Sequence, residues 1–473
     1  MPLNPEKKSK SEQAHGPKVI LVGKAKNEGP YLLEWIAYHY ALGIDHILLV
    51  TNDLDDGSEL LLQKLHDHGV VTFKDVTDLP VGDSIGRRAH KAAFNEKTLH
   101  DHDWVLVLDI DEFLVLKNHN NIKDFISGFE HCDAVVLYWR LFGSSGKVEA
   151  EPDKLVIETF TGALSIERTP TDNIKAISKV KSLKGLGAHI CTYNHDEVTI
   201  SNANGELLLN KVPCNEVRKN VYHNPLAVEP NFENAQVNHY AIKSVEDYLS
   251  KQVRGVALTR VSGSNPKNNF KRFYNNNFND VTDICAFSMI EKTKDTITEI
   301  TSKCNLEDIN KTIKERFLSK IEQLKKNNNQ YNILKELCLN NNFITMSYDD
   351  IFKEINKDPE DVFYWEILYK RLQIDDNGKN KYKVLKKAIS LNPIDPRIIL
   401  KISSEFYRNG YLKEAKKFLK SFDFEDTSIF DPESISGKRI KVATKRKKKL
   451  IGRINRQSNK SEDTEKKLYA KTG

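Results

Sequence analysis

"DWVLVLDIDEFLVL", residues 103–116, is the stretch that decides the fold. Its apolar run from Trp104 to Leu108 is typical of a buried strand. Asp109 and Asp111, with Glu112 behind them, interrupt that run where the strand should leave a sheet. Burying a carboxylate without a partner costs several kcal/mol, so the fold must supply a cation, protons or hydrogen-bond donors at this strand end.

The preceding sequence alternates between strand and helix patterns. Apolar runs at residues 19–22, 46–50 and 70–76 predict strands, and apolar residues at helical spacing predict helices at 31–43, 58–69 and 86–100. Strands separated by helices of this length indicate βαβ units and therefore a parallel sheet. We expect an α/β fold that binds its ligand at the carboxyl ends of the strands.

Four polar segments should meet at that edge of the sheet. They are residues 24–28, residues 52–58, Arg87 with Arg88, and residues 109–112. Two aspartates one residue apart at a strand end can both turn toward one ligand, and carboxylate oxygens are what Mg²⁺ and Mn²⁺ prefer. Since such ions also take phosphate oxygens, the pattern predicts a site for a metal-bound diphosphate.

The second half of the chain is predicted to be helical and to carry a repeat. Pro359 and Pro393 lie 34 residues apart, and in that frame Trp365 matches Ile399 and Leu368 matches Ile402. A period of about 34 residues resembles tetratricopeptide repeats, with an ordinary helical bundle as the alternative. We divide the chain into a disordered tail (1–17), the α/β domain (18–287), a helical linker (288–357), the repeats (358–429) and a basic, disordered tail (430–473).

Composition is that of a soluble globular protein with 39% hydrophobic and 29% charged residues and a net charge of +6. No apolar run is long enough to span a bilayer, and the polar amino terminus lacks a secretory signal, so we expect a cytoplasmic protein. The basic run at residues 438–456 fits either a solvated tail or peripheral association with an anionic membrane. Because no aromatic residues are interleaved with this basic run, we expect no nucleic-acid partner. The cysteines have no CxxC spacing and are expected to be reduced thiols.

Four segments together resemble a known enzyme family. They are "KAKNEGPYLLEWIAYHYALGIDHILLVTNDLDDGS", "DWVLVLDIDEFL", "YWRLFGSSG" and "NHYAIKSVEDYLSKQVRG", within residues 18–287. In combination they look like glycosyltransferase family 2, in a bacterial branch related to family 92. The resemblance implies a Rossmann-like GT-A fold, a nucleotide-sugar donor, a Mn²⁺ or Mg²⁺ ion and an inverting, hexosyltransferase-type reaction.

The resemblance also implies roles for particular residues. The loops carrying Lys26, Asn27, Glu28, Asn52, Asp53 and Asp56 would hold the nucleoside, and Arg88 the ribose or diphosphate. Asp109 would contact the ribose and the metal, Asp111 would be the principal metal ligand, and His239 a further ligand. His239 could instead be an ordinary core histidine, and His189 is the second histidine candidate. Thr51 stands where many family 2 members have an aspartate that binds the base of the donor. The identity of that base is therefore open, and we expect a UDP-sugar first.

No motif identifies the catalytic base that would activate the acceptor hydroxyl. Glu158 and Glu149 are the candidates. The Gly/Ser loop at 142–146 fits either an acceptor pocket or a plain turn, and Trp35 and Trp139 are predicted as core aromatics. The acceptor is expected to be a glycan or a lipid-linked precursor in cell-surface polysaccharide biosynthesis. Alternatives are a non-catalytic scaffold acting through the repeats, and a nucleotidyltransferase, which would want a more glycine-rich loop than residues 23–29 offer.

Overall fold

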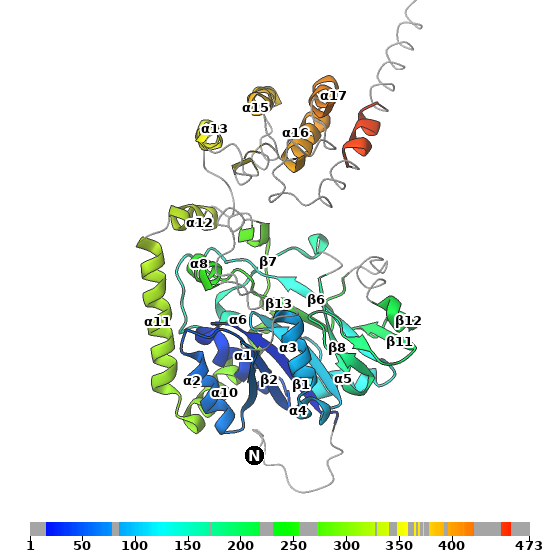
Figure 1. Ribbon diagram of the computed structural model, residues 1–473, viewed down its shortest axis with the longest axis vertical. Helices are drawn as coiled ribbons and strands as arrows, with labels where there is room; N and C mark the ends of the chain where they lie inside the picture. The colour runs from blue at the N-terminus through cyan, green and yellow to red at the C-terminus, as the bar shows by residue number, and fades with distance from the viewer. Residues whose placement is uncertain are drawn as a thin grey trace, which may run out of the picture. The chain divides into compact units, whose positions relative to one another are not determined.

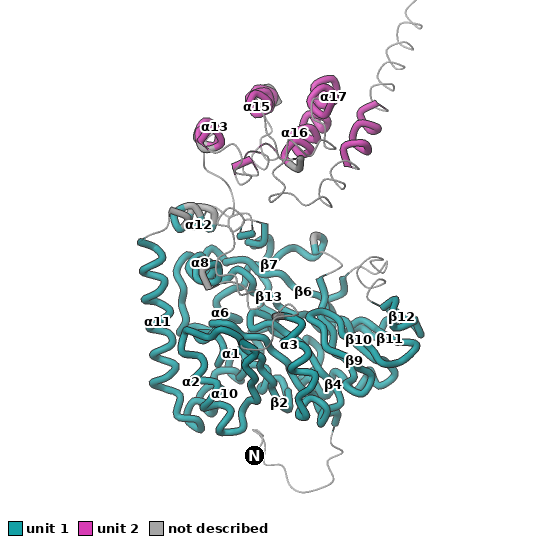
Figure 2. The backbone as a smooth tube through the Cα atoms, viewed as in Figure 1, with its two compact units in different colours: residues 1–265, 272–342 teal, residues 266–271, 343–473 magenta. Residues whose placement is uncertain are grey.

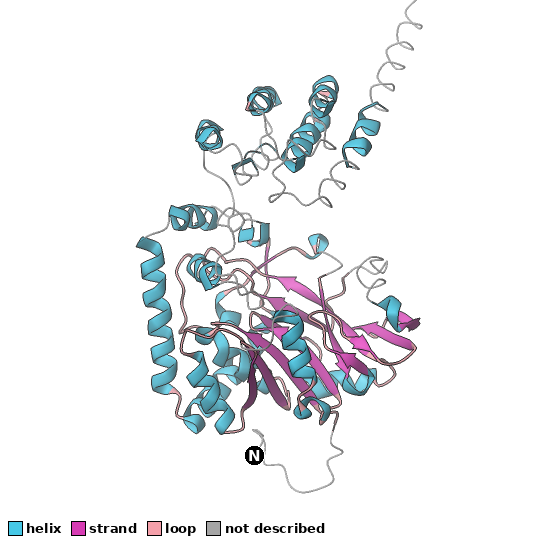
Figure 3. Ribbon diagram, in the orientation of Figure 1, coloured by secondary structure: helices cyan, strands magenta, loops and turns pink. Residues whose placement is uncertain are grey.

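The computed structural model divides the chain into two compact units, residues 1–265 with 272–342 and residues 266–271 with 343–473 (Figure 2). It describes residues 16–77, 85–169, 173–217, 230–254, 272–273, 275–326, 329–339, 348–357, 364–365, 368, 372, 378–391, 396–409, 411–420 and 446–455. The first unit is mixed α/β and the described part of the second is helical (Figure 3). This confirms the predicted order of an α/β domain followed by a helical region.

Four parallel strands form the half of the sheet that the sequence predicted. β1 (Val19–Ala25) lies between β2 (His46–Thr51) and β4 (Trp104–Asp109), and β3 (Val71–Asp75) lies outside β2. Successive β1 residues alternate between two buried clusters, with Val19 and Leu21 in one and Ile20 and Val22 in the other. The sheet is therefore covered on both faces, as a parallel sheet requires.

The other half of the ten-stranded sheet is mixed. β8 (Ile174–Lys179) runs antiparallel to both β4 and β6 (Ala134–Leu141). β11 (Glu197–Asn202) lies parallel to β6 and antiparallel to β12 (Leu207–Pro213). Smaller pairs are β9 (Leu183–Gly185) with β10 (Thr192–Tyr193), and β7 (Gly162–Ala163) with β14 (Val281–Thr282).

The chain changes direction where the acids lie. β4 ends at Asp109, and β5 (Glu112–Leu116) begins three residues later with a different partner, β13 (Ala235–His239). β13 is antiparallel to β5 and parallel to β6, and its register puts His239 opposite Glu112. β13, which is distant in sequence from β4 and β5, thereby places His239 beside the acids of residues 109–112.

Helices cover both faces of the sheet in the first unit (Figure 1). α1 (Gly29–Ala41) packs against α10 (Ile290–Cys304) and α11 (Glu307–Lys326), whose side chains Ile300, Cys304 and Ile313 are buried in the same core as Trp35. The first two helices of the segment predicted as a linker therefore belong to the core of the first unit. The remaining helices here are α2 (Ser58–Asp67), α3 (Ile85–Phe94), α4 (Lys97–His100), α5 (Ile122–Ile126), α6 (Val156–Thr159), α8 (Val245–Arg254) and α12 (Asn329–Leu339).

The second unit contains α13 (Tyr348–Lys357), α15 (Gly378–Ser390), α16 (Pro396–Arg408) and α17 (Leu412–Lys420), and residues 446–455 are also helical. The matched repeat positions Trp365, Leu368, Ile399 and Ile402 are all buried. Pro359 and Pro393 lie outside the described residues, and the tetratricopeptide-like repeat stays a prediction. Among the described helices, none is long and apolar enough to cross a membrane.

Candidate active site

The carboxylate of Asp109 at the end of β4 is held by two lysines. Lys24, the next-to-last residue of β1, places its Nζ 3.1 Å from one carboxylate oxygen, and Lys175 of β8 lies 3.4 Å from the other. Burial alone would raise the pKa of Asp109, but the two ammonium groups outweigh it and hold the pKa well below the usual range. The Asp109 side chain is still 40% exposed, so a fixed carboxylate faces the edge of the sheet.

Glu112 is the fully buried acid of the group. Its carboxylate lies 2.7 Å from Lys175 Nζ and accepts a 2.9 Å hydrogen bond from the backbone N–H of Asp109. Burial raises the pKa of Glu112 to about 8, against the pull of Lys175. The Lys175 side chain is completely buried, and its pKa is raised because attraction to Glu112 and Asp109 outweighs the effect of burial. Glu112 and Lys175 thus form an internal pair beneath the edge.

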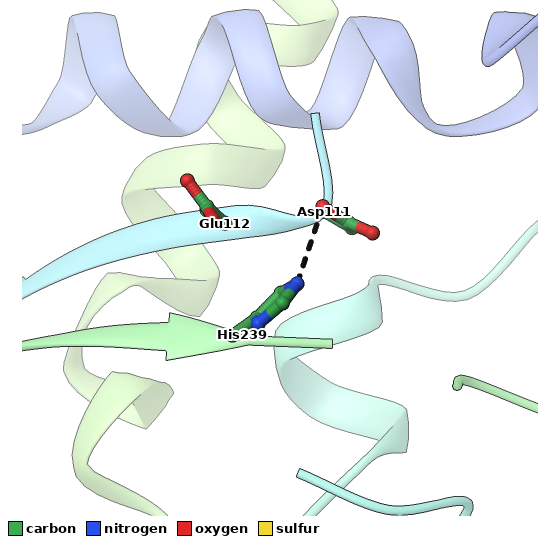
Figure 4. A group of neighbouring side chains, drawn as sticks. All are labelled: Asp111, Glu112 and His239. Atoms are coloured by element: carbon green, nitrogen blue, oxygen red, sulfur yellow. Dashed lines mark ion pairs between the residues drawn. The ribbon is translucent and has the colours of Figure 1, made fainter. Parts of the chain in front are cut away.

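Asp111 lies in the turn between β4 and β5 and contacts a lysine and a histidine. Lys251 of α8 donates a hydrogen bond to one carboxylate oxygen, and the other is 3.7 Å from His239 Nε2 (Figure 4). Burial favours the neutral carboxyl group, but Lys251 and His239 hold the pKa of Asp111 well below its usual range. Burial lowers the pKa of His239 to about 4, so its imidazole is neutral at pH 7 and keeps a lone pair for a ligand.

Three of these side chains could supply ligand atoms to a metal ion. Ligand atoms of Asp111, Glu112 and His239 lie within 4.8 Å of one another. Glu112 binds Lys175 and the Asp109 N–H through Oε2, while its Oε1 is buried without a hydrogen-bond partner among the described residues. The Asp111 carboxylate and the neutral His239 ring face each other, and His239 Nδ1 likewise has no partner there. One carboxylate and one imidazole, completed by phosphate oxygens, fit a divalent ion.

The loops after β1 and β2 are joined to each other. Lys26 Nζ lies 3.1 Å from a carboxylate oxygen of Asp53, and the Asn52 amide donates to the same oxygen at 2.9 Å. Asn27 and Asp53 adopt left-handed backbone conformations, with φ of 51° and 47°. Since both loops follow neighbouring parallel strands, the structure brings together the segments that the sequence predicted to hold a nucleoside.

Asp56 and Arg88 differ in their surroundings. Both carboxylate oxygens of Asp56 accept backbone hydrogen bonds, one from Gly29 at 2.8 Å and one from Ser58 at 3.0 Å, so Asp56 ties the first turns of α1 and α2 together. Arg88 is buried on α3. Two residues farther along α3, His90 has its pKa lowered to about 4 by burial and by Lys24, which places this helix beside the Asp109 group.

Glu158 lies on α6, where its half-exposed carboxylate is 3.4 Å from Lys294 of α10. No contact among the described residues joins it to the acids after β4, and Glu149 is exposed. α6 itself is anchored by the buried Glu34 of α1, whose carboxylate accepts the N–H groups of Val156 at 2.8 Å and Ile157 at 3.2 Å.

A row of rings flanks the acids on the side of β6. Trp139 lies between His239, at a centroid distance of 4.3 Å, and His189, at 5.2 Å. Lys175 Nζ is 5.6 Å from the Trp139 ring centre. His189 therefore belongs to the same neighbourhood as His239, although its Nδ1 is held by the carbonyl of Ile174 at 2.9 Å. Trp35 is a core residue as predicted, whereas Trp139 is only partly buried.

The Gly/Ser loop after β6 is fixed by a distant asparagine-rich segment. Asn277 accepts the N–H of Ser144 at 2.6 Å, and Asn279 accepts that of Ser145 at 2.8 Å. A Cβ on Gly143 would come within 2.3 Å of the carbonyl oxygen of Phe278, so only glycine fits there. The loop thus joins the end of β6 to the segment at residues 277–279.

Sequence reasoning placed Lys24 at the edge of the sheet, within segment 24–28, but gave it no role, and it missed Lys175 and Lys251. Lys24, Lys175 and Lys251 supply the positive charge around the acids. Lys24 had a local signal, since a lysine inside a buried strand must find a partner at the strand end. Lys175 and Lys251 come from β8 and α8, and their pairing depends on long-range contacts.

A family model of glycosyltransferase family 92 matches residues 23–277, more than half of the chain. This chain belongs to glycosyltransferase family 92. The matched range contains the end of β1 with Lys24, all of β4, the three acids, Lys175, His239 and Lys251, so the family match covers the charged centre of the site. The family 92 part of the predicted resemblance is confirmed, and the relation to family 2 stays a prediction.

Two further similarities accompany this family 92 assignment. A Ricinus communis protein described as a glycosyltransferase family 92 protein is 24% identical over 150 residues, which are 30% of this chain and 26% of that protein. The chain thus matches about a quarter of the length of this curated relative. The crystal structure of S. aureus TarS aligns with 35% of this chain and 29% of its own, at 14% identity and a TM-score of 0.22.

Proposed function

We propose that this family 92 glycosyltransferase has a GT-A fold and transfers a sugar from a nucleotide-sugar donor with a Mn²⁺ or Mg²⁺ ion held by Asp111 and His239. The observation that carries the proposal is the 3.7 Å approach of a carboxylate to a neutral imidazole at the carboxyl edge of the parallel strands. Ligands of open α/β sheets bind at this edge. The family resemblance implied both residues as metal ligands, together with Asp109.

The joined loops after β1 and β2 fit the nucleoside. Lys26, Asn52 and Asp53 form one hydrogen-bonded group beside Asp109, whose carboxylate is oriented by Lys24 and Lys175. In this proposal Asp109 faces the ribose, with Asn27 and Glu28 beside it and Arg88 approaching from α3, while Asp56 acts by holding the loop. A UDP-sugar is the first donor to test.

The proposed mechanism rests on neutralising the negative charge of the leaving group. The leaving nucleoside diphosphate gathers negative charge during transfer, and a bound divalent ion neutralises it without a proton donor. Lys251 and Lys24 lie at the same edge and add fixed positive charge to a partly buried site, where it acts most strongly. Inversion needs a base for the acceptor hydroxyl, for which Glu158 stays the sequence-based candidate.

The acceptor we propose is a glycan or lipid-linked precursor of a cell-surface polysaccharide. The support is the basic run at residues 438–456, which suits an anionic membrane surface on the cytoplasmic side. Deleting residues 438–473 should then reduce association with vesicles containing anionic lipid. Equal association of the full and shortened chains would remove the membrane part of the proposal.

Asp111→Asn tests the reaction itself. It should lower metal-dependent hydrolysis or transfer from the donor at least ~100-fold, because the variant loses the charged ligand at the centre of the site. Asp101→Asn, at the opposite end of β4 and exposed, is the matched control and should keep full activity. Circular dichroism would show that both variants are folded.

Calorimetry with UDP-, GDP- and CMP-sugars in the presence of Mn²⁺ identifies the donor. Full activity of Asp111→Asn would contradict the metal role. Failure of every nucleotide sugar to bind would favour the alternative of a non-catalytic scaffold that acts through its helical repeats.

A further inference from the structure

A pocket lies beside Asp111, between the start of α1 and α8. Its lining includes Asn27, Glu28, Tyr31, Lys243, Lys251 and Phe317. Lys251 donates to Asp111 and also to the carbonyl oxygen of Ala241 at 3.2 Å, so one lysine forms part of both the pocket and the proposed metal site. A ligand in the pocket would therefore lie next to the reacting diphosphate.

Lys243 is the unusual residue of this pocket. Its side chain is buried, with the residue 5% exposed, and its Nζ lies 4.5 Å from the centre of the Tyr31 ring. Among the described residues no ion pair or hydrogen bond satisfies this ammonium group. A contact with an aromatic face offsets only part of the cost of removing an ammonium group from water. The backbone of Lys243 is also left-handed, with φ of 55°.

The acids near Lys243 already have partners. Asp247 accepts hydrogen bonds from the Tyr31 hydroxyl, from the Ser244 hydroxyl at 2.6 Å and from the Ser244 N–H at 3.1 Å. Asp111 is bound by Lys251. The Lys243 charge is attracted to Asp247, Glu34 and Asp111, but none of these carboxylates lies within ion-pair distance of its Nζ. The ammonium group on the pocket wall therefore has hydrogen-bond donors free for an anion that enters the pocket.

We propose that this pocket binds a phosphate or carboxylate group carried by a sugar substrate, with Lys243 as its counter-ion. Phe317, whose ring meets Tyr31 edge-on at 6.1 Å, offers an apolar surface for the sugar ring. The anion can come from the donor diphosphate or from an acidic group on the acceptor. The inference rests on the proposed function only in assigning the anion to a substrate of sugar transfer.

Calorimetry on the full chain separates the two sources. UDP with Mn²⁺ is the donor probe, and glucuronate and glucose 6-phosphate without metal are the acceptor probes. Lys243→Met should weaken binding of at least one probe about tenfold or more, as expected for losing a hydrogen bond to a charged group. Lys243→Arg should retain most of the affinity. Lys184→Met, the same change at an exposed lysine of β9, should leave it unaltered.

A second variant protects the test against misfolding at the left-handed position. Ser250→Asp adds a negative charge to the pocket wall without touching Lys243, and should weaken the same probe, whereas Ser250→Asn should not. Weaker UDP binding assigns the anion to the donor, and weaker binding of glucuronate or glucose 6-phosphate assigns it to the acceptor.

Two results would overturn the inference. One is that no probe binds the wild-type chain; the other is that Lys243→Met and Ser250→Asp, both folded, bind every probe as the wild type does. Neither of these two results depends on the metal role proposed for Asp111. If Asp111→Asn kept full activity while Lys243→Met lost anion binding, the metal proposal would fail and the anion site would stand.

Discussion

Each of the three acids after β4 has a lysine as counter-ion, and each lysine comes from another part of the chain. Lys24 and Lys175 bind Asp109, Lys175 also binds Glu112, and Lys251 binds Asp111. The positive charge that these acids require is therefore supplied in part by the protein. A metal ion at Asp111 would have to share that carboxylate with Lys251, or displace the lysine toward solvent.

The Lys175–Glu112 pair provides a stability prediction. Lys175→Met leaves Glu112 buried without its partner and should lower the free energy of unfolding by about 3 kcal/mol, the scale for breaking a buried pair. Adding Glu112→Gln should recover part of this loss, because no unpaired carboxylate then remains. Urea unfolding of both single variants, the double variant and Lys184→Met measures the coupling. Additive losses in the double variant would contradict the pairing.

The sequence could identify site residues that have a local signal, but not those whose contacts are distant along the chain. Asp109 and Asp111 were found because two acids interrupt a local apolar run. Lys175 sits in an alternating strand where its direction depends on β4 and β6, and nothing within a few residues marks it as buried. Asp56 was grouped with the ligand-binding loop by position, whereas the structure shows its oxygens bound to helix N–H groups.

At the scale of elements, residues 18–109 were largely predictable, whereas the separate strand β5 was not predicted. β1, β2, β3 and β4 all occur where the apolar runs predicted strands, because each is flanked by a helix of clear period. The pairing of β13 with both β5 and β6 was not predictable, since a strand that joins segments about 120 and 100 residues away has no local signal. That pairing is what positions His239.

Glu34 gives a pH prediction for one element, α6. Burial raises the pKa of Glu34 to about 7 from an ordinary value of 4.5. A raised carboxyl pKa contributes stability that is complete below about pH 4.5 and is lost as the pH rises through 7. Glu34→Gln removes this titration, so the wild type's advantage over the variant in unfolding free energy should shrink between pH 5 and pH 8, by on the order of 3 kcal/mol.

Urea unfolding of both chains at pH 5, 6, 7 and 8 measures that difference, and titrations common to the two chains cancel. Glu158→Gln, the same change at a half-exposed site on α6, is the control for the substitution itself. A constant difference between wild type and Glu34→Gln across the range would mean that Glu34 titrates normally.

On the scale of the whole molecule, composition and length predicted several domains, and the structure has two compact units. The difference lies at the boundary. The helices from residue 290 to residue 326 looked like a linker because their sequences are rich in lysine, but an amphipathic pattern does not say which surface it covers. In the structure their apolar stripe covers α1.

This boundary predicts how the chain can be shortened. A chain ending at Asn342 keeps α10 and α11 and should unfold in one cooperative transition, whereas a chain ending at Phe287 loses Ile300, Leu306 and Ile313 from the core. Each buried aliphatic side chain contributes about 1.5–3 kcal/mol, so the loss approaches the ~5–15 kcal/mol that stabilises a typical domain. The shorter chain should bind a hydrophobic dye and lack a cooperative thermal transition. If instead it unfolded at the same temperature as the longer chain, α10 and α11 would be the linker that the sequence suggested, and the contacts with α1 would be dispensable.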